Sequence, residues 1–229
     1  MQPDSSIDLF HLPVPIPALD IVIFTIYRDE LCVILTAPTH VNAKGKNVLP
    51  GSILTAWLTL ELSFDKILQE KTGITGVYKE QLATFGDPHR DSRGHVLSIV
   101  YYALINTEMF LQGIDMTKVT LLPLREVSSE TVAYDHAHII HYARQRLEWK
   151  MEYSTIIRNI LPLQFTLSQF QHMYEVVFGR AFDKRNFRKR LLSLWIISPT
   201  GDKNTTDSKR PAELYNFMND DIVIASMIK

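Results

Sequence analysis

Hydrophobic residues follow two different patterns over the first 150 residues of the chain. Runs rich in β-branched and aromatic residues predict strands, and they occupy residues 20–27, 31–36, 76–85, 96–105 and 119–124. A short polar turn separates the first two runs, so these two strands are expected to form a hairpin.

Two segments of the same region place apolar residues at helical spacing instead. The segment 58–71 ends just before Gly73, a residue that suits the left-handed backbone found after helices. The second predicted helix covers 136–150. The positions expected on their buried stripes are Leu60, Phe64, Ile67, Leu68, Ile139, Ile140, Ala143 and Leu147. We therefore expect a mixed α and β domain over 18–151, after an irregular segment, 1–17.

The remaining residues, 152–229, predict a second domain with a different order of elements. A short helix is expected over 153–161. The next helix is opened by Thr166 and Gln169, which have capping-box spacing, and Gly179 closes it.

A third helix is predicted over 183–194, with Asp183 as its N-cap. Strands are expected at 195–197 and 211–217, on either side of a polar loop, 200–209. Helix, turn, helix and hairpin is the order of a winged helix-turn-helix domain.

The small net charge of −1 hides a strong asymmetry between the two parts. Residues 1–143 hold 10 basic and 16 acidic residues, whereas residues 144–215 hold 13 basic and 7 acidic residues. A basic domain joined to an acidic one is a candidate for binding nucleic acid.

Apolar and cationic residues lie on opposite sides of the helix predicted for 183–194. Phe187, Leu191 and Leu194 share a buried face. Cations three or four residues apart on the other side repel one another, and an anionic partner such as DNA removes that repulsion. These cations are Lys184, Arg185, Arg188, Lys189 and Arg190.

Residues near the start of such a helix reach base edges, so Lys184, Arg185 and Arg188 are candidates for base readout. Asn186 suits adenine, although it also fits a solvated surface. The other candidate DNA contacts are Lys189, Lys203, Lys209, Arg210 and Ser168. A solvated basic face, or a docking site for an acidic protein, is the alternative for the whole surface.

Three separated segments resemble one known family. The first resembles a degenerate Nudix box and comprises 49–52 and 69–74; the second is the loop 85–94; the third comprises 183–188, 199–201 and 210–215. In this order they resemble the Nudix-related transcriptional regulators of the NrtR-like group, over residues 18–217.

The resemblance implies a fold, a function and partners. The fold is α+β: an N-terminal Nudix-like α/β/α sandwich with a mixed sheet, and a C-terminal winged helix. Members are homodimeric regulators, commonly repressors, that bind a palindromic double-stranded DNA operator. The Nudix-like domain senses a small-molecule effector, an ADP-ribose-type nucleotide or a sugar.

The Nudix box has lost most of its carboxylates. Aligned on Gly73, its acidic positions fall on Leu58, Ile67, Glu70 and Lys71, so that only Glu70 is retained. A Mg²⁺ ion beside pyrophosphate needs clustered carboxylates. We therefore expect no catalytic residues, no metal, no cofactor and no enzyme activity. An active Nudix hydrolase of a nucleoside diphosphate derivative is the alternative.

The candidate effector contacts lie in the polar loop 86–94, where cationic and acidic groups can hold a phosphate or a sugar hydroxyl. They are Asp87, Arg90, Asp91 and Arg93. A salt-bridged turn that only organises the loop is the alternative. The histidines of the chain form no recognisable zinc-ligand set.

The composition excludes several other classes of protein. Cys32 is the single cysteine, so no internal disulfide can form, and a reducing, cytoplasmic location is expected. The first residues lack the pattern of a signal peptide. No apolar run is long enough to span a membrane.

Overall fold

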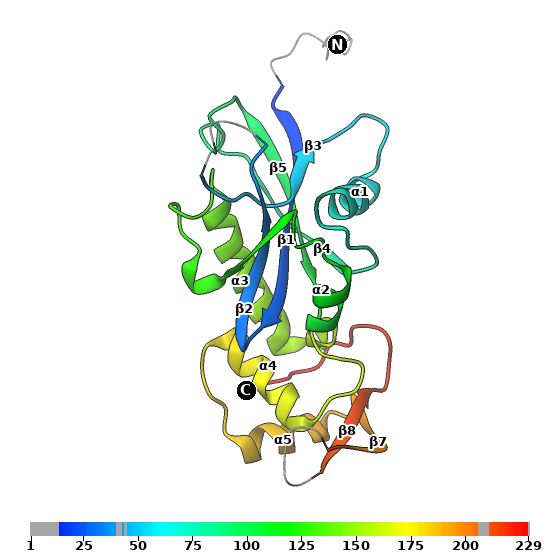
Figure 1. Cartoon of the computed structure of the whole chain (residues 1–229). Helices are drawn as coiled ribbons and strands as arrows, with labels where there is room; N and C mark the ends of the chain where they lie inside the picture. The colour runs from blue at the N-terminus through cyan, green and yellow to red at the C-terminus, as the bar shows by residue number, and fades with distance from the viewer. Residues whose placement is uncertain (1–13, 40–42, 44, 206–210, 229) are drawn as a thin grey trace, which may run out of the picture.

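The computed structural model describes residues 14–39, 43, 45–205 and 211–228. Its larger part is a mixed sheet between helices (Figure 1), which confirms the α/β/α sandwich that the resemblance implied. The strand order is β4-β5-β1-β2-β6, with β3 paired to β1. The strands are β1 (Ile16–Tyr27), β2 (Glu30–Thr36), β3 (Gly51–Ile53), β4 (Tyr78–Phe85), β5 (Val96–Leu104) and β6 (Val119–Pro123).

The central strand β1 is parallel to β5 and antiparallel to β2 and β3. Residues 18–26 of β1 are buried without interruption, because helices cover both faces of the sheet. This explains why the sequence of β1 is almost continuously hydrophobic rather than alternating.

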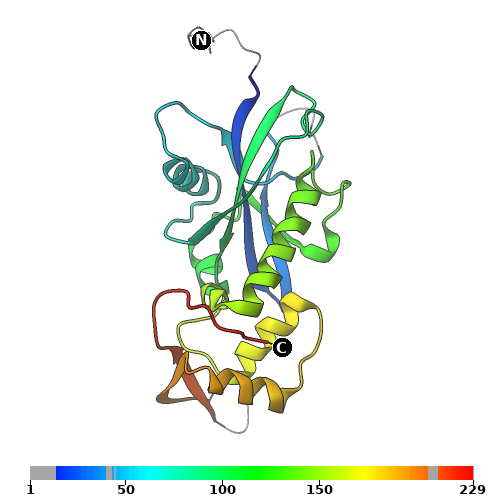
Figure 2. The same cartoon turned by 180° about the vertical axis from the view of Figure 1, so that it is seen from behind.

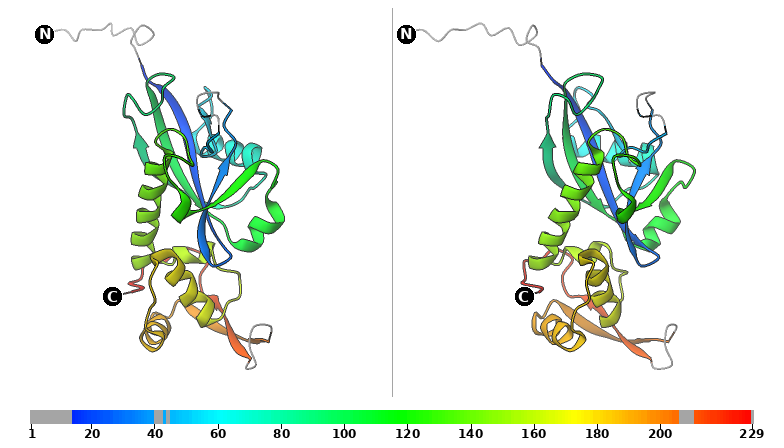
Figure 3. Two further views of the ribbon diagram at one scale, coloured as in Figure 1. Left: turned by 60° about the vertical axis from the view of Figure 1, so that its left-hand side comes forward. Right: turned by 90° about the vertical axis from the view of Figure 1, so that its left-hand side faces the viewer.

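Helices α1 (Leu60–Thr72) and α2 (Thr107–Gly113) lie on one face, and α3 (His136–Tyr153) lies on the other (Figure 3). The buried stripes predicted for α1 and α3 are confirmed, and Gly73 ends α1 with a φ of 82°. The sequence analysis missed α2, a helix too short to show a clear periodicity, which Asn106 caps.

The second unit contains η3 (Ile156–Asn159), α4 (Leu167–Phe178), α5 (Lys184–Ser193), β7 (Ile197–Asn204) and β8 (Ala212–Phe217). The capping box of Thr166 and Gln169, the left-handed Gly179 and the Asp183 N-cap are all present as predicted. Helix, turn, helix and hairpin therefore follow in the expected order (Figure 2).

The short helix predicted over 153–161 is wrong. Helix α3 runs through Tyr153, and the chain is extended at Ser154 before the 3-10 turn η3. The reason is tertiary: Thr155 donates its backbone N–H to Val223 O rather than to a helical carbonyl. Glu152, where the sequence placed the domain boundary, lies in the last turn of α3.

The predicted strand 195–197 and loop 200–209 also need correction. Trp195 is exposed and has a φ of 54°, so it forms a turn, and β7 begins at Ile197. Strand β7 continues to Asn204 because it pairs with β8, with a register shift between Pro199 and Lys203. A partner distant in sequence, not local propensity, sets these bounds.

The two units share one hydrophobic core. The cluster on the α3 face of the sheet runs from Val22 through Leu147 to Phe170 and Tyr215. Tyr174 of α4 donates its hydroxyl hydrogen to Met151 O, at 3.0 Å. The winged helix therefore packs directly on the end of α3 and below the β1–β2 hairpin (Figure 1).

The C-terminal segment 218–228 returns to the junction of the two units (Figure 2). Ala225 and Met227 donate backbone N–H groups to Tyr153 O and Glu152 O. Arg190 of α5 donates to Ser226 O. Within the described ranges, no helix combines the length and apolar composition that crossing a bilayer requires.

Candidate functional site

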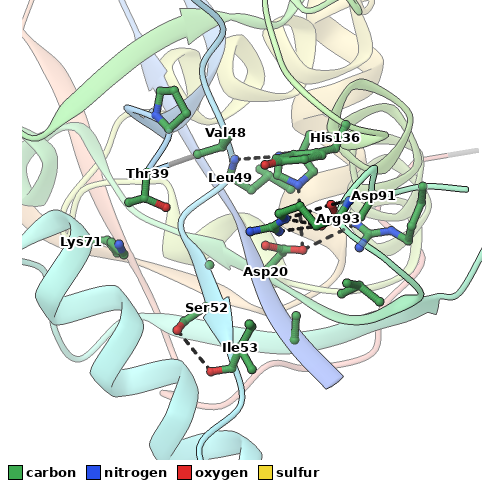
Figure 4. Close-up of a pocket in the computed structure, with 16 residues that line it drawn as sticks. Asp20, Thr39, Val48, Leu49, Ser52, Ile53, Lys71, Asp91, Arg93 and His136 are labelled. Carbon is green, nitrogen blue, oxygen red and sulfur yellow. Dashed lines mark hydrogen bonds and ion pairs between the residues drawn. The ribbon is translucent and has the colours of Figure 1, made fainter. Parts of the chain in front are cut away.

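A pocket of about 320 Å³ opens at one edge of the sandwich, beside the start of β1 (Figure 4). Strands β1 and β3, the loop 90–93, the end of α1 and the start of α3 build its walls. The polar and charged residues of its lining include Asp20, Ser52, Lys71, Arg90, Asp91, Arg93, Tyr134 and His136.

A buried carboxylate organises the base of this pocket. Asp20 is only 8% exposed and accepts a hydrogen bond from the hydroxyl of Ser98 at 2.5 Å. Its Oδ2 atom lies 3.7 Å from Arg90 Nη2 and 3.9 Å from His136 Nε2. A buried charge needs such partners, because burial alone would disfavour it.

His136 is held in one tautomer by the backbone. The Leu49 N–H donates to His136 Nδ1 at 2.9 Å, so that the proton of the neutral ring lies on Nε2, facing Asp20. Burial lowers the pKa of His136 below its ordinary 6.5, and the negative charge of Asp20 offsets only part of this effect. His136 is therefore a neutral donor.

Arg90 is fixed by two acidic residues. Its Nε and Nη2 atoms donate to both oxygens of Asp135, at 2.9 and 2.7 Å, and its side chain is only 3% exposed. The bidentate pair joins the loop 86–94 to the start of α3. Arg90 therefore organises the pocket wall, which is the structural role that the sequence analysis kept as an alternative.

Arg93 forms a second pair that is more open to solvent. It donates from Nε to Asp91 Oδ1 at 2.9 Å and from Nη2 to Asp91 Oδ2 at 2.5 Å, and 35% of its side chain is exposed. Hydrogen bonds from Arg93 lower the pKa of Asp91, and the same pairing raises the pKa of Arg93. Its guanidinium also lies 5.3 Å from the ring centre of Tyr134.

The fourth predicted effector residue lies outside this pocket. Asp87 is exposed and accepts from the backbone N–H of His89 at 2.7 Å, which organises the turn. The pocket lining includes Arg90, Asp91 and Arg93 but not Asp87. Ligand contact by any of the four residues stays a prediction.

The glycine that matters for the pocket is Gly51, next to the box position assigned to Ser52. A Cβ atom at residue 51 would lie 2.0 Å from Asp20 Oδ1, so β3 can approach β1 only with glycine there. Gly51 and Asp20 are far apart in sequence, so this contact is not visible in the sequence. The alignment on Gly73 places the first glycine of the box on Ser52, one residue after the glycine that the structure requires.

The residues at the box positions do not fit a magnesium ion. Glu70, the retained carboxylate, is exposed and lies outside the pocket lining, while the half-buried Lys71 borders the pocket. Asp20 and Asp91 are already paired with groups of the chain. Among the described residues, no three carboxylate, histidine or cysteine side chains gather as metal ligands.

Three of the five cations predicted to face outward on α5 are exposed, and the other two, Arg188 and Arg190, are half-buried. Lys184, Arg185, Asn186 and Lys189 are exposed, while Phe187 and Leu191 are buried beneath them. None of the four exposed residues forms an ion pair with an acidic residue in the part of the chain that the structure describes.

Arg188 differs from the other cations of this helix. It is half-buried and donates from Nη2 to Ser168 Oγ at 2.7 Å, linking α5 to the first turn of α4. Its buried Nε has no hydrogen-bond partner. Since Ser168 sits at the N-terminus of α4, the pair lies where backbone N–H groups also favour a phosphate.

Of the three basic residues predicted to contact DNA from the region of the wing, only one lies among the residues that the structure describes. Lys203 is exposed on β7, whereas Lys209 and Arg210 lie outside the described residues. Arg190, the fifth cation of α5, is half-buried and donates to Ser226 O of the C-terminal segment.

The sequence alone did not reveal which residues distant from the loop 86–94 along the chain form or support the pocket. They are Asp20, Gly51, Lys71, Tyr134, Asp135 and His136. Asp20 and His136 looked like the start of an apolar strand and the start of a helix. A carboxylate at the start of an otherwise apolar, two-sided strand was the available signal for Asp20, because a charge there needs a buried partner.

The comparisons with known proteins agree with both units. The family model described as the NrtR DNA-binding winged helix domain matches residues 157–217. The ADPR responsive transcriptional repressor NtrR of Acinetobacter baylyi is 31% identical over 208 residues, covering 90% of this chain and 83% of that protein.

Two solved structures extend the likeness. The crystal structure of Shewanella oneidensis NrtR complexed with a 27mer DNA is 33% identical, with a TM-score of 0.78, over 87% of this chain and 92% of that chain. The NUDIX domain of the same protein, complexed with ADP ribose, is 30% identical with a TM-score of 0.54, over 61% and 93% of the two chains. Because the likeness spans the pocket and the helix-turn-helix together, the chain belongs to the NrtR family of Nudix-related transcriptional regulators.

Proposed function

We propose that this chain is a transcriptional repressor that binds a palindromic operator as a homodimer and is released from it by an ADP-ribose-type nucleotide. The single observation that carries the proposal is the exposed cationic face of α5. Its residues Lys184, Arg185 and Lys189 form no ion pair with any acidic residue that the structure describes. A reducing cytoplasm suits it, since Cys32 is its one cysteine.

The DNA-binding part of the proposal rests on the geometry of the helix-turn-helix. Lys184, Arg185 and Asn186 form the first turn of α5, the turn that reaches base edges when such a helix enters the major groove. Lys189 and Lys203 are assigned to phosphate contacts, as are Lys209 and Arg210, which lie outside the described residues. Arg188, a base-readout candidate from the sequence, is assigned with Ser168 to phosphate instead, because the two side chains are hydrogen-bonded.

The effector part of the proposal rests on the pocket. Arg93 is the pocket guanidinium with an exposed surface, and a diphosphate in the pocket would compete with Asp91 for it. The Acinetobacter relative is named for its response to ADPR, and the Shewanella domain was solved with ADP ribose. These likenesses make ADP-ribose the first ligand to test.

The mechanism that we propose is a shift between two arrangements of the dimer. The sandwich and the winged helix share a continuous core, so a change at the pocket is transmitted as a change in the angle between the two winged helices. An arrangement that no longer matches the half-site spacing binds the operator weakly.

The absence of hydrolase activity is also part of the proposal. The box positions hold Leu58, Ile67 and Lys71 instead of carboxylates, and Glu70 lies outside the pocket. Incubation of the chain with ADP-ribose and Mg²⁺ should release no AMP above the level of a heat-treated control. Steady turnover would favour the hydrolase alternative.

DNA binding is tested with the full-length chain and a pool of random duplexes. Repeated selection should enrich a palindromic sequence, ADP-ribose should weaken its binding, and Arg185→Ala should weaken it about 10-fold or more. A chain that enriches no duplex, or binds with an affinity insensitive to salt, would instead support a scaffold that docks acidic proteins.

A further inference from the structure

Lys71 occupies an unusual place in the pocket. It lies in the last turn of α1, at a box position where the resemblance leads one to expect a carboxylate, and it lines the pocket from the side opposite Asp91 and Arg93 (Figure 4). A cation in this turn is compatible with the negative end of the helix dipole. The local fold therefore tolerates lysine where metal binding would require an acid.

The other charged groups of the pocket already have partners within the chain. Asp20 is satisfied by Ser98 and Arg90, Arg90 by Asp135, and Arg93 by Asp91. Lys71 forms no ion pair and no side-chain hydrogen bond with any residue in the described ranges. Lys71 is a half-buried residue at the pocket wall, and its ammonium group has no partner among the described residues, so an anion in the pocket gains more from it than from a fully exposed lysine.

The negative charge of a bound diphosphate can be compensated either by a metal ion or by a lysine side chain. A diphosphate brings two negative charges into a pocket, and these need compensation by a metal or by cationic side chains. A Mg²⁺ ion near Lys71 would be repelled by its ammonium group and would find no cluster of carboxylates among the described residues. The pocket is therefore suited to compensating a diphosphate with cationic side chains.

We propose that this pocket binds its diphosphate ligand without a divalent cation, and that Lys71 takes the place of the metal by contacting the diphosphate directly. Arg93 supplies the second positive charge from the opposite wall. The inference rests on the proposed function, because it takes the ligand to be an ADP-ribose-type nucleotide.

The test is calorimetric titration of the full-length chain with ADP-ribose, once in EDTA and once in excess Mg²⁺. The two dissociation constants should agree within about 2-fold. Lys71→Ala should weaken binding in EDTA by about 10- to 100-fold, since a charge-assisted contact is lost. Lys66→Ala is the matched control: it removes an exposed lysine of the same helix that does not line the pocket.

Uncharged adenosine separates a direct contact from a structural effect. Lys71→Ala should leave adenosine binding, measured in competition with ADP-ribose, within about 2-fold of the wild type, because adenosine carries no phosphate. Equal losses for both ligands would overturn the direct contact. Lys71→Glu should abolish binding in EDTA.

Each remaining outcome has one meaning. Wild-type binding that appears only with Mg²⁺, or a Lys71→Ala variant that binds ADP-ribose as tightly as the wild type, would overturn this inference and leave the proposed function intact. If the wild type binds ADP-ribose under neither condition, the proposed ligand is wrong, and the inference falls with it.

Discussion

The two guanidinium groups of the pocket illustrate how burial divides roles between similar residues. Arg90 is almost fully buried and holds Asp135 and Asp20 together, while Arg93 is about one-third exposed and pairs with the adjacent Asp91. A buried pair that loses one partner leaves an uncompensated charge, so Arg90 is suited to structure. Arg93 can exchange its partner at lower cost and is suited to ligand binding.

His136 should make stability depend on pH. Its pKa is below 6.5 in the folded protein because of burial, so the unfolded chain takes up a proton first as the pH falls. The stabilisation is therefore complete above pH 6.5 and is lost as the pH drops below it, at up to about 1.4 kcal/mol per pH unit.

Urea denaturation between pH 7 and pH 5 measures this effect. In His136→Asn the amide oxygen can still accept from the Leu49 N–H but does not titrate, so the loss of stability over this range should be smaller than in the wild type. Parallel curves for the two proteins would show that His136 is not the titrating group.

At the scale of elements, α5 shows what helical periodicity predicts and what it does not. The buried face of Phe187 and Leu191 and the exposed Lys184 and Arg185 follow from a period of 3.6 residues. The half-buried place of Arg188 does not, because it depends on Ser168 of another helix. A predicted surface residue thus became part of the contact between α4 and α5.

The salt dependence of DNA binding tests the exposed face of α5. Lys184→Ala removes one cation that we assign to DNA, so the slope of log K against log salt should become less steep by about 1. Fluorescence anisotropy with the selected operator, at several salt concentrations, gives this slope. Lys66→Ala, an exposed lysine on α1, should keep the wild-type slope; a change in both variants would point to a general charge effect.

The whole molecule is joined by its C-terminal segment. Ala225 and Met227 hydrogen-bond to the end of α3, Val223 bonds to Thr155 just beyond it, and Met227 is buried at 3% exposure in the core that the two units share. Arg190 ties the same segment to α5. The segment therefore holds together the junction through which a signal from the pocket would pass.

Substitutions in this segment should separate buried from exposed contacts. Met227→Ala should lower the free energy of unfolding by about 2 kcal/mol or more, because it leaves a cavity in the core. Ile224→Ala, at a position that is 83% exposed, should change it by less than about 0.5 kcal/mol. Chemical denaturation measures both, and a Met227→Ala protein as stable as the wild type would show that the segment does not hold the junction.

Much of the fold could be predicted because it is encoded in short-range patterns. The buried stripes of α1 and α3, the Thr166 capping box, Gly73 and Gly179 each depend on residues within one or two helical turns. The bounds of β7 and the extended Ser154 could not be predicted, because hydrogen bonds to residues distant in sequence compete there with local propensity.

The sequence by itself determined the two units, the cationic helix and the loss of the Nudix carboxylates, since each is a matter of residue type and spacing. The tertiary structure alone decided which charges meet in the pocket. Asp20, Lys71 and His136 lie far apart along the chain, and only the packing of β1, α1 and α3 around one cavity brings them together. Charge compensation acts through space, over a few ångströms, so spacing in the sequence carries little information about it.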